Sequence, residues 1–209
     1  MFNKILILAP HTDDGEFGCG GTMAKLLEQK SEIYYAAMSS AEKSLPPGAS
    51  PDTLVQELTA AMASLGIDRD RLRIFDYSVR DFPEHRQAIL DDLIRLKQEI
   101  QPDLVLLPCF NDTHQDHQTV AQEGFRAFKD TTILGYEIPW NTKTFNTESF
   151  VLLEERHLAA KVKALMCYKS QLDRFYANET FVRSLATTRG TQIGAAYAEA
   201  FEVIRWVIK

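Results

Sequence analysis

Short runs of consecutive apolar residues alternate along the chain with longer segments in which apolar residues recur every three or four positions. The runs at 5–8 and 104–107 contain only isoleucine, leucine and valine, which is typical of strands buried on both faces of a sheet. Segments between such runs, for example 86–100, have the spacing of amphipathic helices. Strands that alternate with helices predict an α/β protein with a mostly parallel sheet.

The remaining elements follow the same alternation. Strands are expected at residues 5–8, 33–38, 72–75, 104–107, 132–136, 150–153 and 200–207. Helices are expected at residues 22–30, 51–65, 86–100, 116–128, 154–171 and 180–187. A polar, glycine-rich turn is expected at 11–21, and a loop at 39–51. No internal repeat divides the chain, so a single domain over 1–209 is expected.

Composition narrows the class of protein. The chain has 209 residues, with 23 Lys+Arg against 29 Asp+Glu and a formal net charge of −6. It carries no basic run, so nucleic acid and anionic membrane surfaces are excluded as main partners, and a small-molecule substrate is favoured. No apolar stretch approaches the roughly 20 residues that a membrane span needs. A chain of this length can bury a sizeable core by itself, so any metal site is free to be functional.

The cysteines indicate a compartment but no site. Cys19, Cys109 and Cys167 are odd in number and form no CxxC pair, which argues against a disulfide framework and against a zinc ribbon. We therefore expect a cytoplasmic protein. Exposed hydrophobic residues beyond Pro139 could serve a subunit interface, so a homo-oligomer stays open.

The first candidate for chemistry directly follows the strand at 5–8. His11, Asp13, Asp14 and Glu16 place one imidazole and three carboxylates within six residues. Crowded acids repel one another unless a positive charge lies among them, and a histidine with a carboxylate is an ordinary ligand pair for zinc. The alternative is a solvated acidic turn that caps the next helix.

A second polar cluster follows the strand at 104–107. It contains Asp112, His114, Asp116 and His117, and the two histidines lie three residues apart at the beginning of a predicted helix, where both can face one point. Both clusters lie at the carboxyl ends of parallel strands, and three of the five histidines of the chain fall in them. We therefore expect one metal site at this edge of the sheet.

An open zinc site needs three protein ligands, and a histidine and an aspartate from the first loop with a histidine from the second would suffice. The remaining acids and imidazole are then candidates for acid and base catalysis on an amide, ester or phosphoryl centre. Gly18, Gly20 and Gly21 suggest a dinucleotide site, but two aspartates lie where the pyrophosphate would be. Close packing of the helix against the sheet explains these glycines better.

These motifs together match a known family. They are Pro10-His11-Thr12-Asp13-Asp14 through Gly18-Cys19-Gly20-Gly21-Thr22, then Asp112-x-His114-x-Asp116-His117, and near the end Lys169-Ser170-Gln171, Arg189-Gly190 and Gly194-x-x-Tyr197-Ala198-Glu199-Ala200-Phe201. In this order they closely resemble the PIG-L/LmbE-like family of zinc-dependent sugar N-deacetylases. The resemblance implies a Rossmann-like three-layer α/β sandwich.

The resemblance also implies a role for each matching residue of the first motifs. His11, Asp14 and His117 would bind the metal, which is Zn²⁺ with Fe²⁺ as the alternative. Asp13 would be the general base that activates the attacking water.

Three further residues receive roles from the resemblance. His114, oriented by Asp116, would be protonated, and would stabilise the tetrahedral intermediate or donate a proton to the departing amine. Tyr197 would polarise the acetyl carbonyl, with a core tyrosine on a terminal strand as the alternative.

The sequence departs from the common pattern of the family at several positions. Thr12 stands in place of the usual proline, and the usual glutamate is displaced by one position to Glu16. Several members carry an arginine three residues before a glutamate in the second long helix, whereas here Leu54 precedes Glu57. The loop at 39–50 is a plausible specificity element.

The sequence therefore predicts a metal-dependent hydrolase that removes acetyl from an N-acetylglucosamine-like sugar, nucleotide sugar or glycoconjugate. A metal-dependent phosphoesterase is the alternative within enzymes, because the bare ligand set allows it. A non-catalytic, metal-stabilised binding module is the alternative from another class, and it would need four protein ligands.

Overall fold

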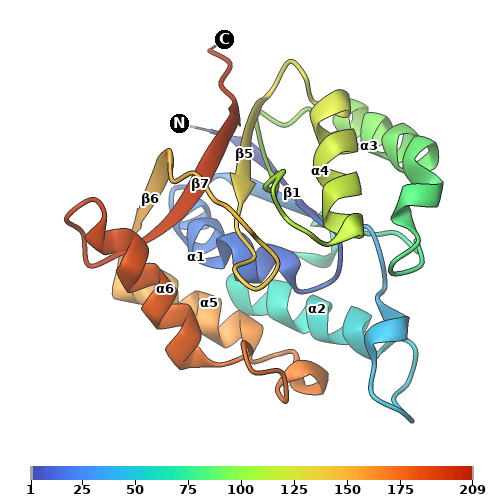
Figure 1. Cartoon of the computed structure of the whole chain (residues 1–209), viewed down its shortest axis with the longest axis horizontal. Helices are drawn as coiled ribbons and strands as arrows, with labels where there is room; N and C mark the ends of the chain where they lie inside the picture. Colours follow the sequence, from blue (N-terminus) through green and yellow to red (C-terminus); the bar gives the residue numbers. More distant parts are fainter. Residues whose placement is uncertain (1, 209) are drawn as a thin grey trace.

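Seven strands form one sheet in the order β3-β2-β1-β4-β5-β7-β6 in the computed structural model, which describes residues 2–208 (Figure 1). The strands are β1 (Lys4–Ala9), β2 (Glu32–Ala37), β3 (Leu72–Ile74), β4 (Leu104–Pro108), β5 (Thr132–Tyr136), β6 (Ser149–Leu153) and β7 (Tyr197–Arg205). The helices are α1 (Asp14–Glu28), α2 (Thr53–Leu65), α3 (Arg86–Ile100), α4 (Gln115–Ala127), α5 (Glu155–Leu165) and α6 (Glu179–Thr191). Short 3₁₀ turns include η1 (Glu42–Ser44), η2 (Arg69–Arg71) and η4 (Lys169–Gln171).

The sheet is parallel from β3 to β5 and antiparallel where β7 joins it. β1 is an interior strand, because Ile5 pairs with Ile33 of β2 on one side and with Leu104 of β4 on the other. β7 runs antiparallel to both β5 and β6. The order of the strands reverses between β1 and β4, and in open α/β sheets ligands bind at such a point.

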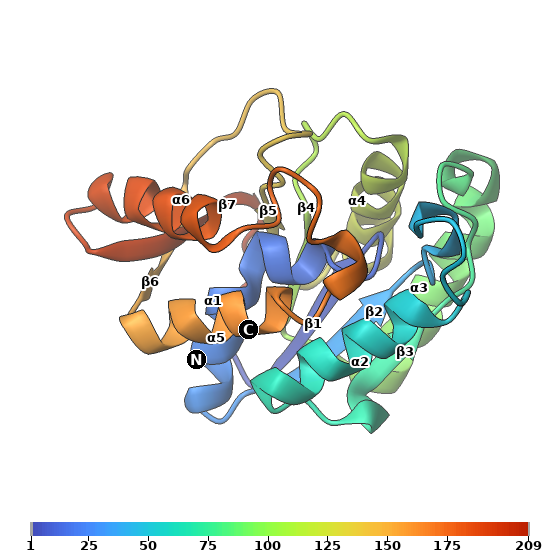
Figure 2. The ribbon, with the colours of Figure 1, turned by 90° about the horizontal axis from the view of Figure 1, so that it is seen from below.

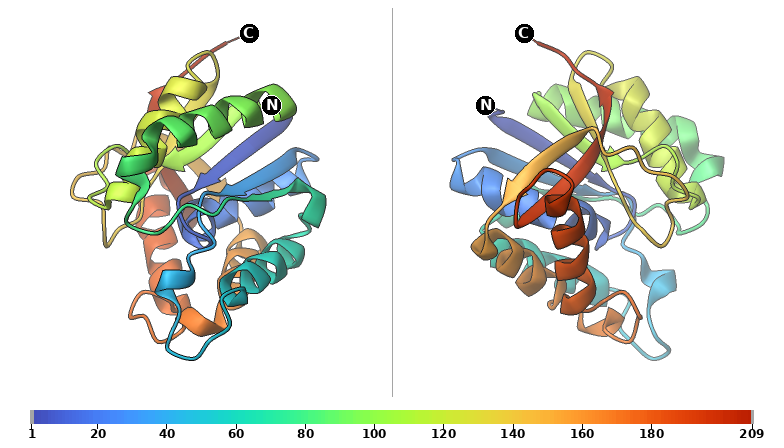
Figure 3. Two further views of the ribbon diagram at one scale, coloured as in Figure 1. Left: turned by 90° about the vertical axis from the view of Figure 1, so that its right-hand side faces the viewer. Right: turned by 60° about the vertical axis from the view of Figure 1, so that its left-hand side comes forward.

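Helices cover both faces of the sheet, which confirms the three-layer α/β sandwich. α1, α2, α5 and α6 lie on one face and α3 and α4 on the other (Figures 2 and 3). Successive residues of β1 serve opposite layers: Ile5 and Ile7 pack in the first core, and Leu6 and Leu8 in the second. Both faces of β1 are therefore buried, as its unbroken apolar run predicts.

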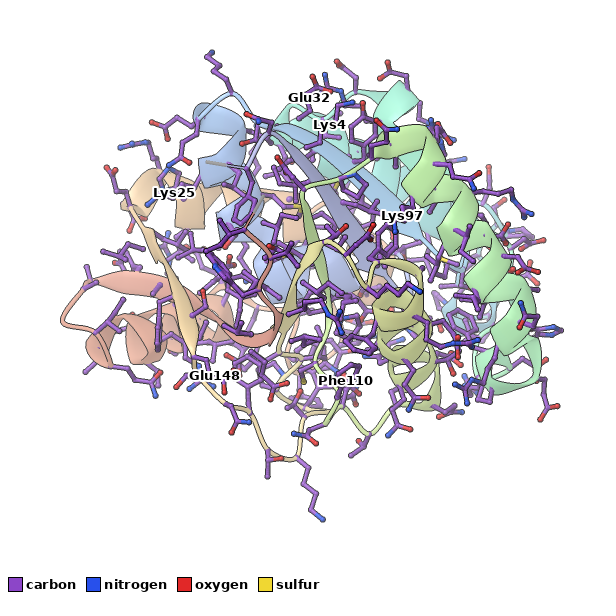
Figure 4. The ribbon with its side chains drawn as sticks, turned by 90° about the horizontal axis from the view of Figure 1, so that it is seen from above. Lys4, Lys25, Glu32, Lys97, Phe110 and Glu148 are labelled. Atoms are coloured by element: carbon purple, nitrogen blue, oxygen red, sulfur yellow. The ribbon has the colours of Figure 1, made fainter. Side chains whose placement is uncertain are left out.

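The two edges of the sheet differ in what they present. Lys4 and Glu32 mark the amino ends of β1 and β2 at one edge, and Phe110, which follows β4, lies at the opposite edge (Figure 4). Both polar clusters of the sequence follow the carboxyl ends of β1 and β4, so they meet at the second edge.

The first helix begins earlier than the sequence predicts. Residues 11–21 were expected to form a turn, but α1 already begins at Asp14 and runs through the glycines, with a non-helical break at Cys19 (φ −147°, ψ 24°). Asp14 and Glu16 lie in its first turn, where negative charge is favourable. The glycines permit close packing: a Cβ at Gly18 would lie 2.2 Å from the ring of Tyr136. Packing thus outweighs the low helix propensity of glycine.

The carboxyl-terminal elements also differ in their bounds. α5 ends at Leu165 instead of residue 171, and the chain then turns so that Tyr168 is buried. α6 is longer than expected, and β7 begins at Tyr197 instead of residue 200. Within residues 2–208 no helix combines the length and the apolar character that crossing a membrane requires.

Candidate active site

A cavity of about 460 Å³ opens at the carboxyl ends of β1 and β4. Its lining includes His11, Asp13 and Asp14 from the first predicted cluster, and His114 and His117 from the second. The size falls in the range of small-molecule sites. The two sequence clusters therefore form one site, as expected from their positions after neighbouring strands.

Three side-chain atoms in this cavity form a nearly equilateral triangle. Asp14 Oδ2 lies 3.1 Å from His11 Nδ1 and 3.2 Å from His117 Nε2. The two nitrogens are 3.4 Å apart. Tetrahedral ligands of a zinc ion, each at about 2.0–2.2 Å from the metal, are roughly 3.3–3.6 Å apart. The triangle therefore fits a divalent cation.

A wider set of imidazoles surrounds the same point. Ligand atoms of His11, His114 and His117 all lie within 4.8 Å of one another, so this cluster could hold a metal. The His114 ring stacks on that of His117 at 4.7 Å between centroids. The shorter and more even distances of the triangle with Asp14 favour that triangle as the primary ligand set, with His114 beside it.

Each imidazole of the triangle is fixed through its other nitrogen. His117 Nδ1 faces Asp112 Oδ2 at 2.7 Å, and His11 Nε2 faces Asp116 Oδ2 at 2.9 Å. A carboxylate in this position orients a metal-binding histidine and makes it a better ligand. Asp116 is held in turn by the backbone N–H of Arg80, which donates to its Oδ2 at 2.7 Å.

The charges of the triangle stabilise one another. Burial alone would lower the pKa of His117, but Asp14 and Asp112 outweigh it and raise that pKa to about 10. Burial likewise opposes ionisation of Asp14, yet His117 and His11 hold its pKa well below the ordinary value. The acidic member is thus ionised, as a metal ligand must be.

Asp13 differs from its neighbour Asp14. Burial, together with the charge of Asp14, raises the pKa of Asp13 to about 6, although His11 and Arg174 oppose this shift. The Asp13 carboxylate lines the cavity, and within residues 2–208 no other residue donates a hydrogen bond to it. A carboxylate that is free to accept a proton near neutral pH has the properties of a general base.

His114 lies directly before α4 and lines the cavity beside the triangle. Its Nδ1 accepts the backbone N–H of Asp116 at 3.2 Å, so the remaining proton is on Nε2. Burial and the nearby charges of His117 and His11 lower the pKa of His114 to about 4. The backbone N–H of Asp116 thus orients His114, and the Asp116 carboxylate faces His11 instead; a protonated His114 in the reaction stays a prediction.

Tyr197 does not line the cavity. It begins β7, where it pairs with Leu153 of β6, and its backbone nitrogen lies against Gly190 of α6. This position matches the alternative of a tyrosine that packs on a terminal strand.

Sequence reasoning missed a buried support beneath the first loop. Glu16 lies at 0% exposure, and the hydroxyls of Tyr35 and Tyr168 each lie 2.5 Å from one of its carboxyl oxygens. The same hydroxyls lie 2.9 and 2.7 Å from the carbonyl oxygen of Thr12. Burial raises the pKa of Glu16 to about 8. Tyr168 directly precedes the motif Lys169-Ser170-Gln171, and this position beside a motif is the feature of the sequence that could have pointed to it.

Residues from distant loops complete the cavity. Trp140 and Tyr176 stack face to face, with 3.7 Å between ring centroids and 7° between planes. Three cations, Lys43, Arg80 and Arg174, also line it. No local pattern in the sequence marks these residues, because they lie in loops and in the short 3₁₀ turn η1.

The motif around Ser170 supports this part of the cavity. Glu57 of α2 accepts hydrogen bonds from the backbone N–H of Ser170 at 2.8 Å and from its hydroxyl at 2.6 Å. The next residue, Gln171, is buried and accepts a bond from Arg174 Nε at 2.6 Å. Leu54 of α2 also lines the cavity.

Comparison with known sequences places this geometry in context. A family model described as PIG-L, GlcNAc-PI de-N-acetylase, matches residues 6–128. A relative from Escherichia coli strain K12, described as uncharacterized deacetylase YaiS, is 28% identical over 179 residues, covering 79% of this chain and 90% of its own. The diacetylchitobiose deacetylase of Thermococcus kodakarensis is 21% identical and covers 96% of this chain and 83% of its own.

Solved structures share the fold. The N,N'-diacetylchitobiose deacetylase from Pyrococcus horikoshii, in complex with its inhibitor MPG, has a TM-score of 0.81 at 24% identity and covers 97% of this chain and 84% of its own. GalB, the 4-carboxy-2-hydroxymuconate hydratase from Pseudomonas putida KT2440, has a TM-score of 0.82 at 18% identity, covering 99% and 98%. The fold is therefore common to deacetylases and to a hydratase.

Proposed function

Because the chain belongs to the PIG-L family, whose model matches residues 6–128 of 209, we propose that it is a metal-dependent N-deacetylase. The proposed substrate is an N-acetylglucosamine-like sugar, nucleotide sugar or glycoconjugate. The observation that carries the proposal is the metal-sized triangle of His11, Asp14 and His117 with Asp13 and His114 in the same cavity. The names of the relatives support the same activity.

In this proposal His11 Nδ1, Asp14 Oδ2 and His117 Nε2 hold the metal, which is zinc or ferrous iron. A divalent cation at this position supplies a Lewis acid that makes water more acidic and polarises an amide carbonyl. Asp112 and Asp116 act through the histidines, by fixing the ring nitrogen that faces the metal.

Asp13 carries the protons of the reaction. With a pKa of about 6 it is mostly ionised at neutral pH, so its carboxylate can take a proton from the attacking water. An amine leaves poorly as an anion, and the protonated Asp13 can then deliver the same proton to the departing nitrogen. One residue thus acts as base and then as acid.

His114 acts as a hydrogen-bond donor. Its Nδ1 accepts the N–H of Asp116, so Nε2–H is the group available to the substrate. We assign it to the acetyl oxygen, where negative charge develops as water adds to the carbonyl. A neutral donor suffices for this role, and a protonated His114 is not needed.

The two alternative functions, a structural metal site and a phosphoesterase, differ from a deacetylase in the chemistry that they require. A structural metal site has no use for a base such as Asp13, which lines the cavity. A phosphoesterase would use the same ligands, and only the product distinguishes it. A cytoplasmic location and a homo-oligomer both stay predictions. The three cysteines, on which the predicted location rests, are free thiols in the structure.

A product screen tests the proposal. Metal-loaded and metal-stripped protein are incubated with a panel of N-acetylated sugars and with phosphate esters of the deacetylated sugars. We expect acetate from at least one N-acetylglucosamine derivative, no release without metal, and recovery when zinc or ferrous iron is added. Phosphate release without acetate release would assign the site to ester hydrolysis instead.

A further inference from the structure

The cavity contains positive charge that the deacetylation itself does not use. Lys43 in η1, Arg80 in the segment after β3 and Arg174 after η4 come from three separate parts of the chain and all line it. All three side chains are exposed. The acids of the lining are Asp13 and Asp14, which already belong to the catalytic group.

None of these cations has an ion-pair partner within residues 2–208. Lys43, Arg80 and Arg174 form no ion pair, although the chain has 29 acidic residues and a net charge of −6. Unpaired cations beside a cavity provide electrostatic complementarity to an anion.

Arg80 is held at the cavity by a strained backbone. Its φ of 72° lies in the left-handed region, which is unfavourable for a residue with a side chain. Its N–H donates to the Asp116 oxygen that also faces His11 Nε2. The backbone of Arg80 is therefore fixed relative to the triangle.

Arg174 is also oriented by its neighbours. Its Nε donates to Gln171 Oε1 at 2.6 Å, and its Nη1 donates to the hydroxyl of Tyr176 at 3.2 Å. Within residues 2–208, Nη2 has no partner. A guanidinium fixed on one side and open on the other is suited to bind a planar or tetrahedral anion.

We propose that the substrate carries an anionic group, a carboxylate or a phosphate, on the part attached to the sugar, and that Lys43, Arg80 and Arg174 bind it. The inference rests on the proposed deacetylation, because the acetamide must lie at the triangle for the rest of the substrate to reach the cations. The three residues determine specificity and take no part in the chemical step.

Matched substrates test this inference. Three N-acetylglucosaminides share one linker and end in a carboxylate, a phosphate monoester or a neutral carboxamide. We expect kcat/KM of the wild type for at least one charged glycoside to exceed that for the carboxamide by about tenfold or more. The preference should weaken with added salt, and the carboxylate and phosphate arms identify which anion is bound.

Variants assign the effect to the cavity. Arg80→Gln and Lys43→Gln should each reduce the ratio of charged to neutral kcat/KM by about threefold or more. Arg69→Gln is the matched control, because Arg69 is exposed in η2 before β3, at the opposite edge of the sheet, and should leave the ratio unchanged. Equal kcat/KM for all three glycosides in the wild type would overturn the inference and leave deacetylation intact.

A binding measurement separates failure of the inference from failure of the proposed function. Dissociation constants of the three glycosides are measured by calorimetry with metal-loaded Asp13→Asn protein. If the wild type releases no acetate, the proposed function fails. The dissociation constants of the three glycosides then still show whether the cavity prefers an anionic ligand. Tighter binding of a charged glycoside by about tenfold supports the anion site, whereas equal binding or none refutes it.

Discussion

His117 is held at both nitrogens of its ring. Nδ1 faces Asp112 at 2.7 Å and Nε2 faces Asp14 at 3.2 Å, with the side chain 2% exposed. Asp112 also accepts the backbone N–H of His114 at 2.8 Å through its other oxygen. One carboxylate therefore orients the proposed ligand and the loop that carries the second histidine.

This arrangement predicts the effect of Asp112→Asn on metal binding. The amide keeps the shape of the side chain but removes the charge that strengthens His117 as a ligand, so metal affinity should fall by about 10–100-fold. Asp91→Asn on the exposed side of α3 is the control. A competition titration against a chelating dye measures both, and an unchanged affinity for Asp112→Asn would contradict the assigned role.

Spacing in the sequence predicted which residues meet but not how they pair. The two histidines three residues apart and the His-x-Asp-Asp motif lie in one cavity, because both motifs follow neighbouring strands. The pairing of the Asp116 carboxylate with His11, 105 positions away, depends on how α4 docks beside β1. Local sequence contains no information on that contact.

At the scale of elements, α1 shows how distant residues support a local irregularity. Helix geometry breaks at Cys19, and the backbone N–H groups of Gly21 and Thr22 donate to Glu199 at 3.0 and 2.6 Å. Lys161 of α5 lies 2.6 Å from the same carboxylate, and both side chains are at most 7% exposed. Glu199 thus caps the second half of the helix from the other end of the chain.

We expect Glu199→Gln to destabilise the fold strongly. It leaves the buried Lys161 ammonium without its counter-charge, and loss of one partner of a buried pair costs about 3–5 kcal/mol of unfolding free energy. Glu179→Gln, which breaks an exposed pair with Arg183, should change it by less than about 1 kcal/mol. Urea unfolding compares the two; equal stabilities would show that the buried pair is not needed.

A comparison of α3 with α1 shows which helices the sequence can predict. Helix α3 has regular apolar spacing, and its predicted bounds, 86–100, are those observed. In α1 the glycines favoured a turn, whereas the structure needs them where a Cβ at Gly18 or Gly21 would collide with Tyr136 or Leu153. Apolar periodicity therefore predicts a regular amphipathic helix such as α3. It does not predict a helix such as α1, whose conformation depends on close packing against distant residues.

At the scale of the whole molecule, the net charge of −6 and the local charge of the cavity have different meanings. The acidic overall balance favours a small-molecule substrate as a prediction, and the cations Lys43, Arg80 and Arg174 gather at one small cavity. The parallel sheet and the site at the reversal of strand order follow from the order of the elements. The cations and Trp140 come from loops and from the short 3₁₀ turn η1, so only the folded structure shows that they meet.

The central claim is that Asp13 acts on water beside a metal held by His11, Asp14 and His117. Acetate release is measured for three proteins with determined metal content, the wild type, Asp13→Asn and His117→Ala, on the best N-acetylglucosamine substrate. The account predicts about one metal per chain with acetate release for the wild type, the same metal content with a loss of kcat of about 100-fold or more for Asp13→Asn, and loss of both for His117→Ala. Acetate release by metal-loaded Asp13→Asn at the rate of the wild type would contradict it.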